Sequence, residues 1–99
     1  MRIVIAGAGA VGTHLAKMLS GNGHDLTVVD VEPKALAEVG NLVDVVTVEG
    51  DTTQFSVLRK AGVRKCDLFI AIDSIENDNV LAAETNDNGN FRTGFPQSY

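Results

Sequence analysis

The fold is decided by residues 1–19, MRIVIAGAGAVGTHLAKML, in which an apolar run leads into three closely spaced glycines. Ile3 to Ala6 is the kind of β-branched and apolar run that forms a strand buried on both faces of a parallel sheet. Apolar residues then recur at helical spacing, and Gly21-Asn22-Gly23 is a typical stop for a helix. This stretch therefore predicts a strand, a glycine turn and a helix.

The same alternation of strand and helix continues along the chain. Apolar runs predict strands at 26–29, 43–48 and 67–72, with one helix beginning at Pro33 and another running from about Thr53 to Gly62. Alternation at this pitch indicates right-handed crossovers and helices on both faces of a parallel sheet. We therefore predict the α/β class, as a Rossmann-like doubly wound parallel sheet.

The C-terminal part of the chain departs from this pattern. A helix is predicted to begin near Ser74 or Glu76 and to carry Val80 to Ala83, and the polar tail at 85–99 has no periodic apolar pattern and is not expected to form a strand. Only about four strands are visible, against six in a complete dinucleotide domain, so the fold looks truncated there. Either the chain borrows a sheet edge from a partner, or it is a fragment or altered reading of a longer domain. We favour the second, and assign 1–84 to the nucleotide-binding domain.

Composition and charge exclude several classes of protein. At 99 residues, with 44% hydrophobic and 21% charged residues, the chain fits one ordinary globular domain. Its net charge of −5, with Lys and Arg scattered along the chain, argues against nucleic acid as a ligand. A single cysteine, Cys66, fits a reducing compartment, and no signal peptide or membrane-spanning stretch is recognisable. We expect a cytoplasmic protein.

The glycines predict a site for a nucleotide, because they follow a predicted strand and open a predicted helix. Gly7 would allow the tight turn, Gly9 the close approach of a diphosphate, and Gly12 the packing of the helix on the strand. The phosphates would lie at the helix N-terminus, where free amides and the helix dipole favour an anion. The alternative is a structural turn without a ligand.

Acidic residues follow the next strands at the same edge of the predicted sheet. Asp30 lies 18 residues beyond Gly12, where a carboxylate can accept the hydroxyls of an adenosine ribose and repel a 2′-phosphate. This favours NAD(H) or another plain adenosine nucleotide, although Asp30 could instead be a solvated strand end or a helix cap. Asp51 could meet the adenine or cap the next helix with Gln54, and Asp73 could line the far half of the ligand or cap a helix. The predicted nucleotide-binding residues are Gly7, Ala8, Gly9, Ala10, Val11, Gly12, Asp30, Gly50, Asp51, Thr52 and Asp73.

Catalytic and metal-binding chemistry find little support in the sequence. His14 has no paired cysteine, lysine or carboxylate in the pattern, so we interpret it as a packing or solvent-facing residue. Cys66 is interpreted as a bystander with weak redox potential. No metal site is predicted.

The assembled motifs resemble the RCK or TrkA-N nucleotide-binding domain of Trk-type potassium-uptake regulators. The resemblance covers about residues 1–84 and is carried by IVIAGAGAVGTHLAKML, HDLTVVD and VEGDTTQFSVLRKAGVRKCDLFIAI. It includes Asp30, the G-D-x-T match that begins at Gly50, the L-x-x-A-G-V match at 58–63, and Asn79. Asp73 and Ser74 depart from it, because the family commonly has Thr and Asp there.

This resemblance implies a cytosolic regulatory subunit that binds NAD+ or NADH, or ATP or ADP. The subunit would assemble as dimers or larger rings with a membrane potassium transporter, and ligand exchange would gate transport. Two other functions remain open from the sequence. One is the cofactor-binding half of an NAD-dependent dehydrogenase, and the other is an interaction domain whose glycine turn binds nothing.

Overall fold

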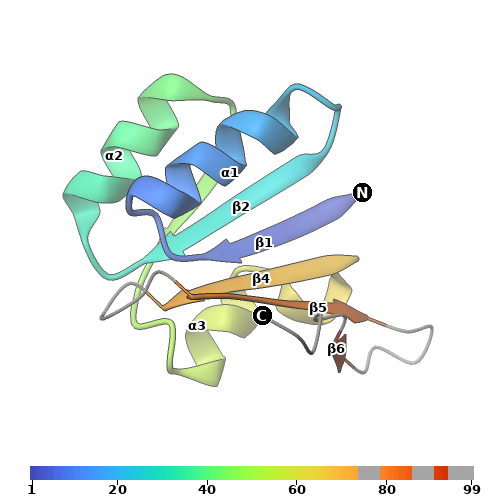
Figure 1. Ribbon diagram of the computed structural model, residues 1–99. Coiled ribbons are helices and arrows are strands. Elements are labelled where there is room, and N and C mark those ends of the chain that lie inside the picture. Colours follow the sequence, from blue (N-terminus) through green and yellow to red (C-terminus); the bar gives the residue numbers. More distant parts are fainter. Residues whose placement is uncertain (74–78, 86–90, 94–99) are drawn as a thin grey trace.

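A computed structural model describes residues 1–73, 79–85 and 91–93 of the chain as an α/β fold (Figure 1). The strands are β1 (Arg2–Ala6), β2 (Asp25–Asp30), β3 (Val46–Glu49), β4 (Leu68–Asp73), β5 (Asn79–Thr85) and β6 (Phe91–Thr93). The helices are α1 (Ala10–Ser20), α2 (Pro33–Leu42), α3 (Phe55–Lys60) and the short 3-10 helix η1 (Val63–Lys65). The first four strands and three helices are those that the sequence predicts.

The strands form one sheet in the order β3-β2-β1-β4-β5-β6. Strand β1 pairs in parallel with both β2 and β4, and β2 pairs in parallel with β3. Chain order reverses beside β1, so the turn after β1 lies at the switch point where open α/β sheets bind their ligands. Asp30 and Glu49 are register partners at the carboxyl ends of β2 and β3.

Helices cover both faces of this sheet. In Figure 1, α1 and α2 lie on one side and α3 on the other. Ile3 and Ile5 belong to the core under α1 and α2, whereas Val4 packs in the core formed with Val63 and Cys66. Successive side chains of a strand point to opposite faces, so a strand covered on both sides must be apolar throughout. The prediction of a doubly wound parallel core is confirmed.

Two predicted boundaries are wrong by a few residues. Helix α2 continues to Leu42, and the Val43 amide donates to the Val39 carbonyl at 3.1 Å, so strand β3 begins at Val46 rather than at Val43. Helix α3 begins at Phe55 rather than Thr53, because residues 51–54 form a turn closed by the bond from the Gln54 amide to the Asp51 carbonyl.

The predicted helix after β4 is also wrong for the residues that the structure describes. Val80 to Ala83 belong to β5, which returns antiparallel along β4 with Ile70 opposite Ala82. A short apolar run is compatible with a helix or a buried strand, and here pairing supplies partners for the free backbone groups along the edge of β4. The starting points at Ser74 and Glu76 lie outside the described residues.

The prediction that the tail at 85–99 contains no strand is wrong for Phe91–Thr93. These residues form β6, which pairs antiparallel with β5 and places Arg92 opposite Glu84. A strand of three residues without an alternating apolar pattern leaves little signal in the sequence. The described sheet therefore has two antiparallel strands added to a parallel core.

Candidate functional site

The glycine turn connects β1 to α1 at the carboxyl edge of the sheet. Gly7 has a φ of +123°, a value that residues with a side chain rarely adopt, and its amide donates to the Val29 carbonyl at 2.7 Å. A Cβ at Gly7 would also lie 3.1 Å from the Cβ of Ile72 on β4. Gly7 thus has the turn-forming role that the sequence predicts.

Gly12 lets α1 approach the turn closely. A Cβ at this position would overlap the carbonyl oxygen of Gly7 and lie 2.8 Å from its carbonyl carbon. The obstacle is backbone, which has no rotamer that could move it away. Gly12 is therefore required for packing between helix and turn.

Gly9 occupies open space, in contrast to the other two glycines. A Cβ there would meet no atom within 4 Å, and Gly9 is the N-cap of α1 without any side-chain cap. The first backbone bond of the helix runs from the Thr13 amide to the Gly9 carbonyl at 2.9 Å. The amides of Ala10, Val11 and Gly12 have no acceptor among the described residues. Free amides at a helix N-terminus provide donors for an anion.

Asp30 joins this turn to the next helix. Its Oδ2 accepts from the Ala8 amide at 2.7 Å, and its Oδ1 accepts from the Glu32 amide at 2.8 Å. Each carboxylate oxygen can accept a further hydrogen bond. Asp30 therefore lies beside the glycine turn with acceptor capacity left for two hydroxyl groups.

Thr13 holds the turn from the other side. Its hydroxyl donates to the Ala8 carbonyl at 2.9 Å, while the amide of Ala8 is bound by Asp30. Both polar groups of the buried Ala8 are thereby fixed. The sequence analysis did not single out Thr13, since a threonine in the first turn of a helix gives no specific signal.

Gly50, Asp51 and Thr52 follow β3 at the same edge. The Gly50 amide donates to the Asp30 carbonyl at 2.9 Å, which brings this turn beside Asp30. The exposed Asp51 carboxylate accepts from the Thr53 hydroxyl at 2.7 Å and from the Thr53 amide at 2.8 Å. Both bonds lower the pKa of Asp51, the hydroxyl bond more strongly. The carboxylate thus caps the turn before α3, and a contact with adenine stays a prediction.

Gly50 gives a stability prediction, because a Cβ there would lie 2.7 Å from one methyl of Val57 and 2.9 Å from the other. We expect Gly50→Ala to lower the free energy of unfolding by about 1–3 kcal/mol, the usual cost of overpacking. In the Val57→Ala background, the same substitution should cost much less, because the obstructing methyls are gone. Urea unfolding of the four variants measures this coupling. Equal losses in both backgrounds would contradict it.

Three further residues that the sequence analysis considered are Asp73, His14 and Cys66. Asp73 is the last residue of β4, at the carboxyl edge, and its side chain lies outside the described set. His14 is exposed on α1. Cys66 is buried, its thiol donates to the Val63 carbonyl at 3.0 Å, and burial raises the pKa of the thiol. Burial and the raised pKa keep this thiol in its protonated, less reactive form.

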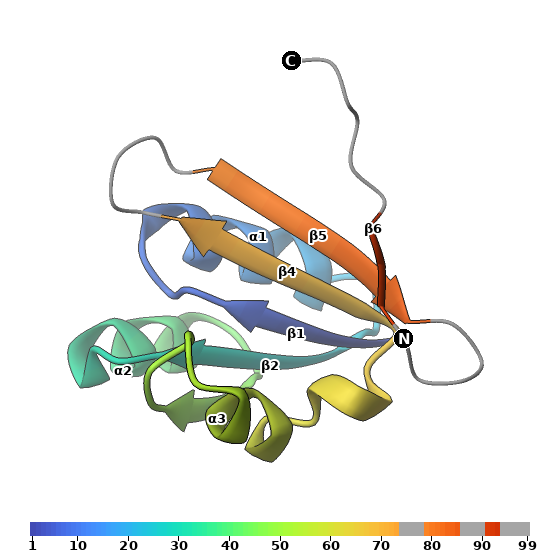
Figure 2. The same ribbon diagram turned by 90° about the horizontal axis from the view of Figure 1, so that it is seen from below.

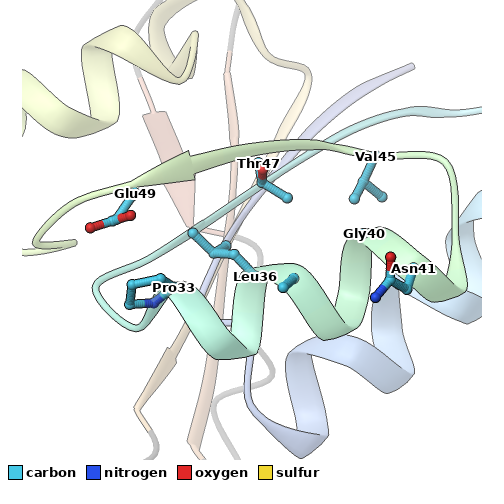
Figure 3. A pocket seen from close by; sticks show the side chains of 8 residues that line it. Pro33, Leu36, Gly40, Asn41, Val45, Thr47 and Glu49 are labelled. Carbon is cyan, nitrogen blue, oxygen red and sulfur yellow. The ribbon is translucent and has the colours of Figure 1, made fainter.

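A cavity of about 500 Å³ lies between α2 and β3 (Figure 3). Its lining residues are Pro33, Leu36, Ala37, Gly40, Asn41, Val45, Thr47 and Glu49. Its lining includes Pro33, the first residue of α2, but proline has no amide to donate, and the Lys34 amide is already bound by the Glu32 side chain at 3.3 Å. The free amides and the Asp30 carboxylate at the glycine turn give more specific recognition chemistry.

Within 1–73, 79–85 and 91–93, no group of three or more His, Cys, Asp or Glu residues is placed to hold a metal ion. Over the same residues, every helix is too short or too polar to cross a bilayer.

A family model and individual relatives point to the same protein family. The TrkA-N domain model matches residues 3–91. A protein of Pyrococcus abyssi called Trk system potassium uptake protein TrkA homolog is 35% identical over 82 residues, which are 83% of this chain and 36% of that protein. The Archaeoglobus fulgidus protein of the same name is 43% identical over 82 residues, again 83% of this chain but 18% of the relative.

A bacterial relative gives the same result. The Trk system potassium uptake protein TrkA of Halomonas elongata is 38% identical over 84 residues, which are 85% of this chain and 18% of that protein. The chain thus spans between about a fifth and about a third of the length of these three relatives. Because the family model covers most of the sequence, including the glycine turn, the chain belongs to the TrkA-N domain family.

Proposed function

We propose that this chain is a cytoplasmic, non-enzymatic regulatory domain that binds NAD+ or NADH and controls a membrane potassium transporter. The observation that supports this most is that the free amides of Ala10, Val11 and Gly12 and the Asp30 carboxylate occur together at the glycine turn. The relatives' names supply the link to potassium uptake. Assembly as a dimer or larger ring is part of the proposal by resemblance to the family.

The chemistry of binding follows from the two parts of the site. The amides and the dipole at the start of α1 would stabilise the diphosphate, and the open space at Gly9 would let it approach the backbone. The unused lone pairs of Asp30 would accept the ribose hydroxyls. Regulation requires in addition that the ligand bind two states of the protein with different affinity.

Charge favours a dinucleotide over ATP. The ends of β2 and β3 carry several acidic side chains, namely Asp30, Glu32, Glu49 and Asp51, and the basic residue near them in the sequence is Lys34. The whole chain has a net charge of −5. A triphosphate brings more negative charge to this edge than the diphosphate of a dinucleotide does. Like charges in proximity weaken binding.

Isothermal titration calorimetry with NAD+, NADH, ADP and ATP, without added Mg²⁺, tests the proposal. We expect the two dinucleotides to bind at least about tenfold more tightly than ATP, a difference of about 1.4 kcal/mol. Tighter binding of ATP would contradict the choice of cofactor. If none of the four nucleotides produced a heat of binding, nucleotide binding itself would be contradicted. A hydride-transfer assay with the same cofactors should show no turnover.

A further inference from the structure

Half of the basic residues lie close together, contrary to the expectation that they are scattered. Four of the eight occur within residues 59–65, RKAGVRK. Arg59 and Lys60 end α3, Arg64 and Lys65 lie in η1, and all four are exposed. We call these four residues the basic patch.

Arg64 and Lys65 of the basic patch lie toward the end of the sheet opposite the glycine turn, whereas Arg59 reaches back over Phe55 at the start of α3. Helix α3 starts after the carboxyl end of β3, and η1 leads to the start of β4. The Asp67 amide just before β4 donates to the Arg2 carbonyl at 2.7 Å, which places η1 near the first residue of β1. Figure 2 shows the yellow η1 segment on the side of the molecule where the N-terminus lies. A ligand held by Arg64 and Lys65 would therefore lie away from the glycine turn.

The fold itself explains only part of this cluster. Arg59 and Lys60 complement the dipole at the C-terminus of α3, but Arg64 and Lys65 have no such role. None of the four forms an ion pair with a residue in the described part of the chain. Asp67 is the nearest acidic residue along the chain, and Asp25, the register partner of Arg2, lines the same cavity as Lys65. The carboxylate of Asp67 already accepts from the Arg2 amide at 2.8 Å.

An aromatic ring adjoins the patch. Phe55 is 51% exposed, and the Arg59 guanidinium lies 5.0 Å from the centre of its ring. Exposed aromatic rings next to lysine and arginine are typical of surfaces that lie on a lipid bilayer, where the ring enters the interface and the cations meet phosphate groups.

We propose that the basic patch binds the anionic surface of a lipid bilayer. A bilayer meets one face of a protein, so it can attract the patch while the acidic remainder of the chain points away. Nucleic acid fits less well, because it needs positive charge along an extended groove and this chain carries −5 overall. The proposal is independent of nucleotide binding.

Vesicle flotation with the 99-residue chain tests this proposal. Vesicles of phosphatidylcholine with 30% phosphatidylglycerol are compared with pure phosphatidylcholine in low salt. We expect binding to the anionic vesicles alone, weakened strongly at 0.5 M NaCl. Each lysine or arginine near such a surface strengthens binding about fivefold, so Arg64→Gln with Lys65→Gln should weaken it about 25-fold.

The matched control is Lys17→Gln with Lys34→Gln, which changes the net charge equally but lies elsewhere in the fold. It should alter binding less than about threefold, because only the position of the charge differs. Circular dichroism establishes that both double variants fold. Equal losses in the two variants, equal binding to neutral vesicles, or no binding to anionic vesicles would each overturn the proposal. The proposal would also be overturned if a polyglutamate peptide or a single-stranded oligonucleotide displaced the chain from the vesicles when the competitor's concentration of negative charges is lower than that of the anionic lipid.

Discussion

Replacing Gly12 with alanine should lower the free energy of unfolding by about 3 kcal/mol or more, the upper end of the usual cost of overpacking. The new methyl would overlap the Gly7 carbonyl, so α1 could keep its place only if the turn or the helix shifted. A domain of this size has a total stability of about 5–15 kcal/mol, which makes such a loss severe. Urea unfolding followed by circular dichroism measures it.

Gly9→Ala is the matched control, because its methyl would enter open space and its φ of −66° suits alanine. We expect this variant to lose at most about 1 kcal/mol, the usual scale of an N-cap effect. It should nevertheless bind NADH far more weakly, since the methyl lies where a diphosphate would approach the amides. Similar stability losses at Gly9 and Gly12 would contradict the separate roles assigned to them. Unchanged NADH affinity in Gly9→Ala would contradict the placement of the phosphates.

The parallel core was predictable because its signal is local and redundant. Strand β1 is apolar and buried from Ile3 to Ala6 and is followed by glycines, a pattern that few other structures accommodate. The same apolar runs located β2 and therefore placed Asp30 at the end of a strand. No comparable redundancy exists after β4, where Val80 to Ala83 fit a helix and a strand equally well. Pairing with the edge of β4, a long-range contact, decided that segment.

The residues of the candidate site were predicted better than their contacts. The glycine spacing identified the turn and the separate roles of Gly7 and Gly12. It could not show that Asp30 binds the amide of Ala8, because that contact depends on the φ of +123° at Gly7 and on the register between β1 and β2. Thr13 was missed for the same reason, since its bond to Ala8 arises only when the turn is folded.

The basic patch shows a different limit of sequence reasoning. Its residues are adjacent in the chain, but the segment reads as a helix end followed by a loop, where lysine and arginine are common. Their significance depends on where α3 and η1 lie in the fold. Only the hydrogen bonds between Arg2 and Asp67 place Arg64 and Lys65 at the end of the sheet opposite the glycine turn.

Asp30→Ala should weaken the affinity for ADP or NADH by about 1–3 kcal/mol, or roughly 5- to 150-fold, because a partly buried acceptor is lost. Two causes could produce this loss. The carboxylate could bind the ribose directly, or it could act only through the Ala8 amide by holding the glycine turn in place.

Titrations with ADP and 2′-deoxy-ADP distinguish the two causes in a double cycle of protein and ligand. If Asp30 accepts from the 2′-hydroxyl, the substitution should weaken ADP much more than 2′-deoxy-ADP, because the second ligand lacks that donor. If Asp30 only positions the turn, both ligands should weaken equally, since their phosphates are the same. Thr13→Val is the comparison variant. It removes the other bond to Ala8 without touching a carboxylate, so it should weaken both ligands to the same extent.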